Sequence, residues 1–374
     1  MKIGFDAKRL FQNKTGLGNY SRTLVRNLQH FFPDNDYFLC TPNTGNSPEC
    51  AEFTKPPYQI ITPSHPFKAY WRTRGLTKEL INKNLNIYHG LSHEIPMGLN
   101  SATIKTVVTI HDLIFKTHPN TYKPIDRFIY DKKWKYSCQN ADAIVAISES
   151  TKNDLLNYYN LSPEKITVIY QPCQPLFYQM QPEKNLLTIK EKYQLPNDFL
   201  LYVGSLQPRK NLLNLIKAYS QLPKNSQIPL VLVGNGRHYK MKIQQLIKSK
   251  QLARNIIRLE NLSSNDHLQA IYQLATILVY PSLYEGFGLP IVEAMLSKTA
   301  VITSNISSMP EAGGDYAWYI NPESPAEIAA TISEVLENDQ ERTRCIALGY
   351  TDAQRRFSIK KLTNEMMNLY QKIG

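Results

Sequence analysis

The fold of this 374-residue chain is decided by Tyr280-Pro281-Ser282-Leu283-Tyr284-Glu285-Gly286-Phe287-Gly288-Leu289-Pro290-Ile291-Val292-Glu293-Ala294-Met295. The apolar run before it, residues 275–280, is typical of a buried parallel strand. Pro290 suits the first position of a helix, where its missing N–H costs nothing. The residues between form a strand-to-helix loop, whose glycines let a ligand approach the backbone and whose helix N–H groups favour an anion. Such a loop, flanked by carboxylates that can bind hydroxyls, suits a sugar nucleotide.

Glu285 and Glu293 stand with seven residues between them, around a Glu-Gly-Phe-Gly-Leu-Pro core. This pattern resembles the acidic motif of the retaining glycosyltransferases of family 4. The resemblance implies that Glu285 binds donor-sugar hydroxyls and is catalytic, and that Glu293 binds the ribose. We expect the rest of the loop to bind the donor too: Gly286, Phe287, Gly288 and Leu289. The alternative is an ordinary acidic loop followed by a helix with a solvated glutamate.

A second strand–loop–helix runs from residue 202 to residue 211 and carries Arg209 and Lys210 at its helix start. A guanidinium fork and a point charge suit a diphosphate, whereas two solvated basic residues are the plain alternative. The segment resembles the family's diphosphate-binding loop, whose lysine aligns with Lys210, so both residues are expected to be catalytic. Many family members carry arginine directly after the glycine; here Ser205 stands there among the donor-binding positions, and Arg209 is expected to supply the guanidinium.

Gly16 and Gly18 precede the first amphipathic helix. They fit a dinucleotide fingerprint poorly, because about ten residues separate them from the strand before. They resemble instead the flexible glycine loop that family members fold over the donor phosphates; a simple helix-start turn is the alternative.

His111 and Asp112 end another predicted strand. His111 matches a family position that contacts the donor sugar, which implies a catalytic role, although a lone strand-end histidine is more often structural. We assign Asp112, Tyr88 and His93 to the acceptor side.

Length and composition predict two domains rather than one core. A hydrophobic content of 42% and a charged content of 20% are typical of a soluble globular protein. No apolar run approaches the ~18–20 residues that span a bilayer, and charge appears too early for a signal peptide, so we expect a cytoplasmic location.

The five cysteines are odd in number and lack C-x-x-C spacing, as expected of reduced thiols. No metal-ligand cluster is visible, and we expect neither a metal nor a cofactor.

The net charge of +12 favours an acidic partner. Residues 67–74 and 123–136 interleave basic and aromatic side chains. Such stretches suit anionic headgroups at the inner face of a membrane, or the phosphates of a lipid-linked acceptor. A solvated helix face is the plain alternative. No nucleic-acid-binding signature accompanies the charge, and we expect no nucleic acid partner.

Short apolar strands alternate with amphipathic stretches, which predicts parallel α/β layers. Prolines around residues 170–175 mark the join, and we expect domains at 1–172 and 173–357 and a final helix at 358–374. The ten predicted strands are 2–5, 37–40, 87–89, 106–110, 143–147, 199–203, 230–233, 256–258, 277–280 and 300–303. The family resemblance implies the GT-B architecture: two Rossmann-like, doubly wound domains face a central cleft, the first binds the acceptor, the second binds the nucleotide sugar, and the last helix crosses back.

The expected function is therefore a retaining, metal-independent transfer of a hexose to a hydroxyl of a glycan or lipid-linked acceptor. Residues 3–7 and 204–211 resemble the branch of bacterial mannosyltransferases that build surface polysaccharides, which implies GDP-mannose as donor and a UDP-sugar next. Two other readings stay open at this point. One is a non-catalytic sugar- or membrane-binding module, which would turn over no sugar nucleotide. The other is a different enzyme on the same scaffold, such as a sugar-nucleotide epimerase, which would need no acceptor, or a phosphorylase, which would need inorganic phosphate.

Overall fold

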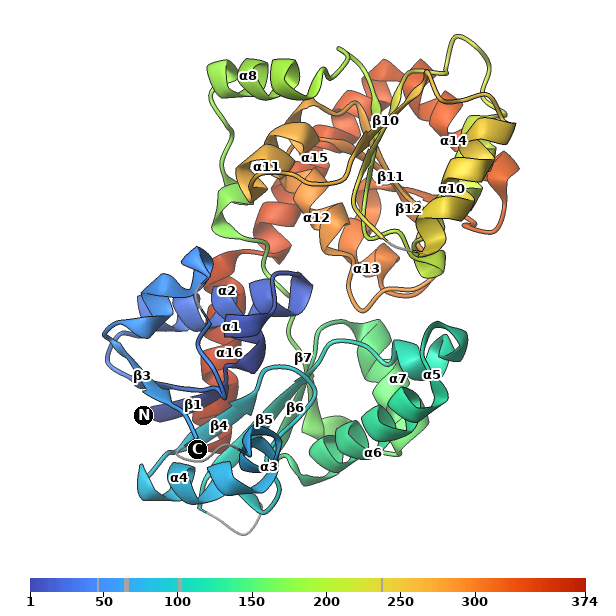
Figure 1. Cartoon of the computed structure of the whole chain (residues 1–374). Helices are drawn as coiled ribbons and strands as arrows, with labels where there is room; N and C mark the ends of the chain where they lie inside the picture. Colours follow the sequence, from blue (N-terminus) through green and yellow to red (C-terminus); the bar gives the residue numbers. More distant parts are fainter. Residues whose placement is uncertain (46, 64–66, 100–102, 237) are drawn as a thin grey trace. The chain divides into compact units, whose positions relative to one another are not determined.

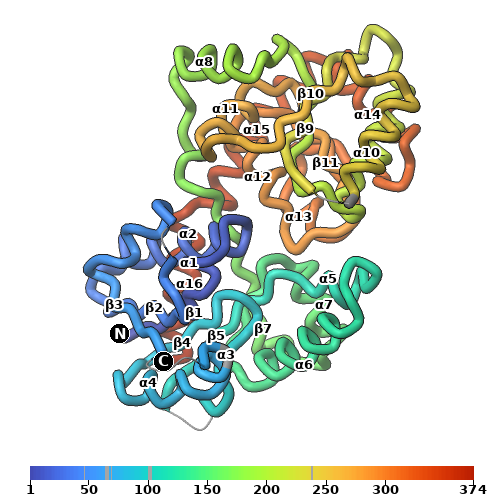
Figure 2. Tube along the Cα trace, in the orientation of Figure 1, coloured from blue at the N-terminus to red at the C-terminus, as the bar shows by residue number. Residues whose placement is uncertain are grey.

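The computed structural model describes residues 1–45, 47–63, 67–99, 103–236 and 238–374. The chain divides into two compact units. Unit 1 contains Met1–Pro172 together with Phe357–Gly374, and unit 2 contains Cys173–Arg356. Both ends of the chain therefore lie in unit 1 (Figure 2).

Unit 1 is built on a parallel seven-stranded sheet with the order β3-β2-β1-β4-β5-β6-β7. Its central strands are buried along almost their whole length, as expected of parallel strands that are covered on both faces. The strands are β1 Lys2–Asp6, β2 Asp36–Cys40, β3 Tyr58–Ile61, β4 Ile87–Gly90, β5 Lys105–Ile110, β6 Ala143–Ala146 and β7 Ile166–Val168. The helices are α1 Lys8–Gln12, α2 Gly16–Phe31, α3 Lys68–Tyr70, α4 Leu76–Asn82, α5 Ile114–Thr117, α6 Pro124–Asn140, α7 Glu149–Tyr159 and α16 Ile359–Ile373.

Unit 2 repeats the plan with a parallel six-stranded sheet in the order β10-β9-β8-β11-β12-β13. Its strands are β8 Leu200–Val203, β9 Leu230–Val233, β10 Ile256–Leu259, β11 Ile277–Tyr280, β12 Ala300–Ser304 and β13 Trp318–Ile320. Its helices are α8 Glu183–Tyr193, α9 Leu212–Tyr219, α10 His238–Ser249, α11 Asn265–Leu274, α12 Leu289–Leu296, α13 Met309–Gly313, α14 Pro325–Glu337 and α15 Asp339–Arg356.

All ten predicted strands are present, with ends shifted by at most one residue. Three further strands, β3, β7 and β13, were not predicted from the sequence. Each is only three or four residues long, lies at an edge of its sheet and is partly exposed. Their hydrophobic signal is weak because an edge strand buries less of its surface than a central one.

The last helix, α16, packs against α2 in unit 1 (Figure 1). Met366, Met367 and Tyr370 of α16 are almost fully buried in the same apolar cluster as Leu24 and Leu28 of α2. Burial of side chains of this size contributes about 1.5–3 kcal/mol each. The final helix is therefore part of the core of unit 1, although the whole of unit 2 precedes it in the chain.

The strand order of each sheet reverses direction at one place. In unit 1 this switch point lies between β1 and β4, and in unit 2 it lies between β8 and β11. Ligands of doubly wound sheets bind outside the carboxyl ends of the strands at such points. The two switch points are thus the places where a site is expected.

The glycines near the start of the chain lie in the first turn of α2, which begins at Gly16. The Asn13 side-chain oxygen accepts hydrogen bonds from Thr15 N at 2.8 Å and from Gly18 N at 3.1 Å. A Cβ on Gly18 would lie 1.8 Å from the Asn13 carbonyl oxygen, whereas a Cβ on Gly16 would meet nothing within 4 Å. The structure therefore shows a tight helix start here, and Gly18 is required by packing.

Replacement of these two glycines tests this explanation. Gly18→Ala forces the Asn13 turn to move and should lower the free energy of unfolding by about 1–3 kcal/mol. Gly16→Ala, the matched control, should stay within about 1 kcal/mol of the parent chain. Urea unfolding of both variants measures the difference, and equal stability of the two would contradict it.

Candidate functional site

Three charged side chains meet at the switch point of unit 2. Arg209 and Lys210 come from the short 3₁₀ turn after β8, Pro208–Lys210, and Glu285 lies in the loop after β11. Arg209 Nη1 and Lys210 Nζ each lie 2.7 Å from the same atom, Glu285 Oε1. The Ser282 hydroxyl donates a hydrogen bond to that oxygen as well. The structure thus brings together three residues that the sequence separates by about 75 positions, a cluster that we call the unit 2 cluster.

Backbone contacts hold the two loops against each other. The Arg209 carbonyl accepts a hydrogen bond from Leu283 N at 2.8 Å. The Asn211 amide donates to the carbonyls of Pro281 and Pro322 at 3.0 and 2.6 Å. Asn211 has a φ of +59°, a backbone conformation that asparagine tolerates better than most residues. The positions of the cations relative to Glu285 are therefore set by hydrogen bonds between the two loops as well as by the attraction between the charges.

The carboxylate of Glu285 is buried, with 8% of the residue exposed. Burial alone would raise its pKa, but the Lys210 ammonium and the Arg209 guanidinium outweigh burial and lower the pKa to about 2. Glu285 is therefore ionised at neutral pH. Since two cations surround one carboxylate, the unit 2 cluster has one positive charge left to balance an anion.

Glu293 lies one turn into α12 and behaves in the opposite way. Burial raises its pKa to about 7, although the Tyr272 hydroxyl, which donates to Glu293 Oε2 at 2.9 Å, favours the ionised form. The two glutamates of the motif therefore differ in charge state near neutral pH. Glu293 can gain or lose a proton there, whereas Glu285 cannot.

The loop between the glutamates ends at the start of α12. Gly288 is the N-cap with a φ of +102°, and Leu289 is the first helical residue. Pro290 occupies the second helical position, one residue later than the sequence predicted. Phe287 is 3% exposed and packs inward, and Gly286 is buried. The N–H groups of this helix start are the kind that bind anions.

The loop after β9, residues 234–236, lies against the loop after β8, and the sequence analysis did not name it. Ser205 is exposed after β8, and the next residue, Leu206, donates from its N–H to the Asn235 carbonyl at 3.0 Å. Gly234 has a φ of +147°, and a Cβ there would lie 1.9 Å from the Gly204 carbonyl oxygen. The Gly-Asn-Gly run directly after the buried strand β9 was the signal in the sequence.

In unit 1, His111 is 5% exposed at the end of β5. Its Nε2–H donates to the Leu91 carbonyl at 2.9 Å, so Nδ1 accepts from the Gln171 amide at 2.8 Å. Burial lowers the pKa of His111 to about 4, and its ring is neutral at pH 7. The Tyr20 ring meets it edge-on at 4.7 Å. The structure therefore holds His111 in one tautomer and one orientation.

The three residues assigned to the acceptor side have different surroundings. His93 has a φ of +65°, stacks on Trp134 at 3.8 Å and lies 5.2 Å from the His111 ring. Asp112 accepts a hydrogen bond from Ile114 N at 3.0 Å, which shapes the local turn. Tyr88 is 1% exposed within the apolar core. Burial and the nearby Asp6 carboxylate raise the pKa of Tyr88, so its hydroxyl lies near the carboxyl end of β1, and its assignment to the acceptor side stays a prediction.

Comparison with known proteins places the chain. The family model described as "Glycosyltransferase Family 4" matches residues 14–174, and "Glycosyl transferases group 1" matches residues 187–352. The chain is a glycosyltransferase, with a family 4 domain followed by a group 1 domain. It is 29% identical to O-antigen chain mannosyltransferase B of Escherichia coli over 99% of this chain and 100% of that protein. It is 28% identical to O-antigen chain mannosyltransferase RfbU of Salmonella typhimurium over 71% and 69% of the two chains.

Among solved structures, Anabaena Alr3699/HepE in complex with UDP matches with a TM-score of 0.79. That match covers 100% of both chains at 17% identity, so it supports the fold alone. A glycosyltransferase from Rickettsia africae matches equally well, at 18% identity and a TM-score of 0.79. The GT-B fold expected from the sequence is confirmed.

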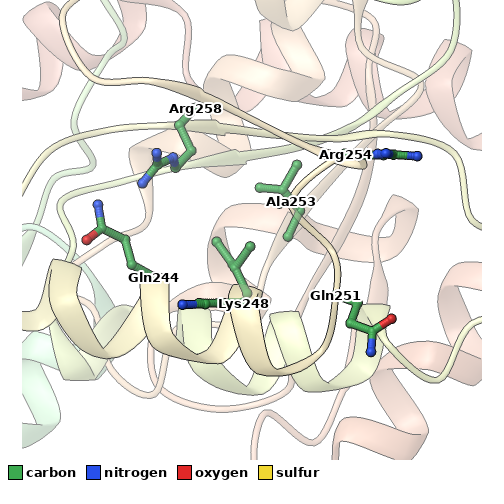
Figure 3. Close-up of a pocket in the computed structure, with 8 residues that line it drawn as sticks. Gln244, Lys248, Gln251, Ala253, Arg254 and Arg258 are labelled. Atoms are coloured by element: carbon green, nitrogen blue, oxygen red, sulfur yellow. The ribbon is translucent and has the colours of Figure 1, made fainter.

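The glycosyltransferase also has a pocket of about 650 Å³ between α10 and β10 (Figure 3). Gln244 and Lys248 line it from α10, and Arg258 lines it from β10. None of the three residues of the unit 2 cluster lines this pocket.

In the described part of the chain, no group of three or more His, Cys, Asp or Glu side chains could hold a metal ion. Likewise, no helix among the described residues is long and apolar enough to span a bilayer.

The opposite pKa shifts of the two glutamates predict two separate pH effects on stability. The pKa of Glu285 falls from 4.5 to about 2 on folding, so its contribution is complete above pH 4.5 and is lost as the pH falls towards 2. The pKa of Glu293 rises from 4.5 to about 7, so its contribution is complete below pH 4.5 and is lost as the pH rises through 7.

Urea unfolding between pH 3 and pH 8 measures both effects. Glu285→Gln should flatten the loss of stability on the acid side, and Glu293→Gln should flatten the loss near neutrality. Glu334→Gln, an exposed control on α14, should change neither slope. If the two site variants kept the parent's pH profile, the charge states assigned to Glu285 and Glu293 would be wrong.

Proposed function

We propose that this glycosyltransferase transfers mannose from a nucleoside-diphosphate mannose to a hydroxyl of a glycan or lipid-linked acceptor in surface-polysaccharide synthesis. GDP-mannose is the first candidate donor, and a UDP-sugar is the second. The two O-antigen mannosyltransferases described above support the sugar and the pathway class. The UDP bound by the Anabaena structure supports a nucleoside diphosphate. We place the reaction in the cytoplasm, at the inner face of the membrane that would anchor a lipid-linked acceptor.

The unit 2 cluster is the observation that carries this proposal. Arg209 and Lys210 converge at a sheet switch point, where doubly wound folds bind ligands. A diphosphate would meet the excess positive charge of the cluster and the N–H groups at the start of α12. Glu285 and Glu293 would then accept hydrogen bonds from the hydroxyls of the sugar and of the ribose.

The proposed reaction retains the configuration of the anomeric carbon. The bond from that carbon to the diphosphate oxygen breaks, and a bond to the acceptor oxygen forms on the same face of the sugar. The acceptor hydroxyl gives its proton to an oxygen of the leaving diphosphate. Lys210 and Arg209 stabilise the negative charge that develops on this leaving group, as preorganised charges do in other enzymes. For His111 we propose a contact with the donor sugar as a neutral imidazole.

No divalent metal is required in this proposal. Lys210 and Arg209 provide next to the diphosphate the positive charge that a metal ion provides in other enzymes. Both side chains are mostly buried, with 12% exposed, so their charges are only weakly screened by solvent.

Transfer assays with GDP-mannose and a lipid-linked glycan test the proposal. Lys210→Ala should lower kcat/KM by about 10²–10³-fold, the usual effect of removing one group that stabilises a developing negative charge. Lys217→Ala, an exposed lysine on the adjacent helix α9, is the matched control and should stay near the parent. Turnover should continue in excess chelator, and proton NMR of the product should show the α configuration of the donor. Near-normal activity of Lys210→Ala, or loss of turnover in chelator, would contradict the mechanism.

A further inference from the structure

The two basic, aromatic-rich stretches of unit 1 meet at one pocket of about 470 Å³. Lys68 and Arg72 line it from the first stretch, and Lys133 lines it from α6 in the second, about 60 residues later. Lys8, at the start of α1, adds a fourth cation. We call this the unit 1 anion pocket. Four positively charged side chains from three separate segments thus surround one cavity.

The pocket lies at the switch point of the unit 1 sheet. Asp6 ends β1, Asn43 follows β2, and Glu94 follows β4, so the carboxyl ends of three adjacent strands meet here. This is the place where doubly wound sheets bind their ligands. The pocket therefore corresponds, in its own sheet, to the position of the unit 2 cluster.

Ion pairs hold two of the four cations, Arg72 and Lys133, in place. Arg72 Nη2 lies 2.6 Å from Asp6 Oδ2, and its Nη1 lies 3.1 Å from Glu94 Oε2. Lys133 Nζ lies 3.3 Å from the same Glu94 oxygen. Asp6 is 2% exposed, so Arg72 cannot leave it without a large electrostatic cost. The Arg72 side chain is thus held in one position at the edge of the pocket. Lys133 is more exposed and can adjust to a ligand.

The charges around the pocket do not balance. Four cations face the two carboxylates of Asp6 and Glu94, which leaves an excess of two positive charges. Burial and the nearby guanidiniums of Arg72 and Arg9 lower the pKa of Lys8, as expected where positive charges crowd together. A doubly charged anion would relieve this repulsion. An arginine fork beside lysines is a common arrangement for binding phosphate.

Large apolar side chains lie next to these cations in the chain. Phe67 is 73% exposed and Tyr70 is 58% exposed, on either side of Lys68. Exposed aromatic and basic residues together suit a phosphate that is attached to a lipid. The side chains beside the pocket therefore favour an amphiphilic ligand over a free ion.

We propose that the unit 1 anion pocket binds a phosphate or diphosphate group of the acceptor. This proposal rests on the proposed function only in assigning the phosphate to an acceptor. It gives that acceptor a chemical class: a glycan linked through phosphate, in which the phosphate is held at unit 1. A phospholipid headgroup also carries a phosphate, and binding to vesicles separates these two sources.

Binding of inorganic pyrophosphate, measured by calorimetry, tests the pocket. The Lys210→Ala variant serves as the parent, so that the unit 2 cluster does not take up the probe. Adding Lys68→Ala and Lys133→Ala should weaken pyrophosphate binding by about tenfold or more, since two charge-assisted contacts are lost. Adding Lys78→Ala and Lys83→Ala instead removes two exposed charges of unit 1 outside the pocket, and should change the affinity by less than about twofold. Equal affinity of both sets, or equal loss, would overturn the proposal.

Sedimentation with vesicles of phosphatidylcholine and phosphatidylglycerol identifies the source of the phosphate. If the pocket binds a phospholipid headgroup, the Lys68→Ala/Lys133→Ala variant loses both vesicle and pyrophosphate binding, and pyrophosphate releases the parent from vesicles; this result would overturn the assignment to an acceptor. If the pocket binds the phosphate of the acceptor, the variant loses pyrophosphate binding and keeps vesicle binding. Thermal stabilisation of the unmutated chain by GDP-mannose is measured separately. Its failure would count against the proposed donor site and leave the pocket result standing.

Discussion

The site depends on one oxygen atom, Glu285 Oε1, which two cations share. A buried carboxylate without partners would take up a proton, and buried cations without a carboxylate would repel each other. Together they link the loop after β8 to the loop after β11. The same interaction leaves one positive charge in excess, which favours an anion at the cluster. The same ion pairs therefore join the two loops and set the net charge of the cluster.

Unit 1 contains a related arrangement at its own switch point, where Arg72 pairs with Asp6 and Glu94. A second, neutral network lies in the core of that unit. The Thr109 hydroxyl lies 2.9 Å from the Tyr20 hydroxyl and 2.8 Å from His89 Nε2, and His89 Nδ1 lies 2.6 Å from the Tyr370 hydroxyl. This network connects α2, β5, β4 and the final helix α16. Because Tyr20 also contacts His111, the end of the chain helps to position a residue of the candidate site.

Local sequence patterns predicted the central strands, the strand–loop–helix around Glu285, and the position of Glu293 one turn into α12. These features depend on hydrophobic runs, glycines and a proline that are close together in the chain. The shared ion pair of Glu285 could not be predicted, because about 75 residues separate its partners and only the strand order brings them together. The burial of Tyr88 was not predicted for a related reason: an aromatic residue within a short strand has the same local sequence whether it faces the core or a ligand. For Gly16 and Gly18 the sequence left two possibilities open, because glycines fit both a flexible loop and a tight helix start.

A crystal structure of the chain with intact GDP-mannose tests the central claim most directly. The account predicts diphosphate oxygens within about 2.7–3.2 Å of Lys210 Nζ and of the Arg209 guanidinium. It also predicts ribose hydroxyls on Glu293 and mannose hydroxyls on Glu285. A diphosphate bound away from these two cations, for example in the pocket between α10 and β10 (Figure 3), would contradict it.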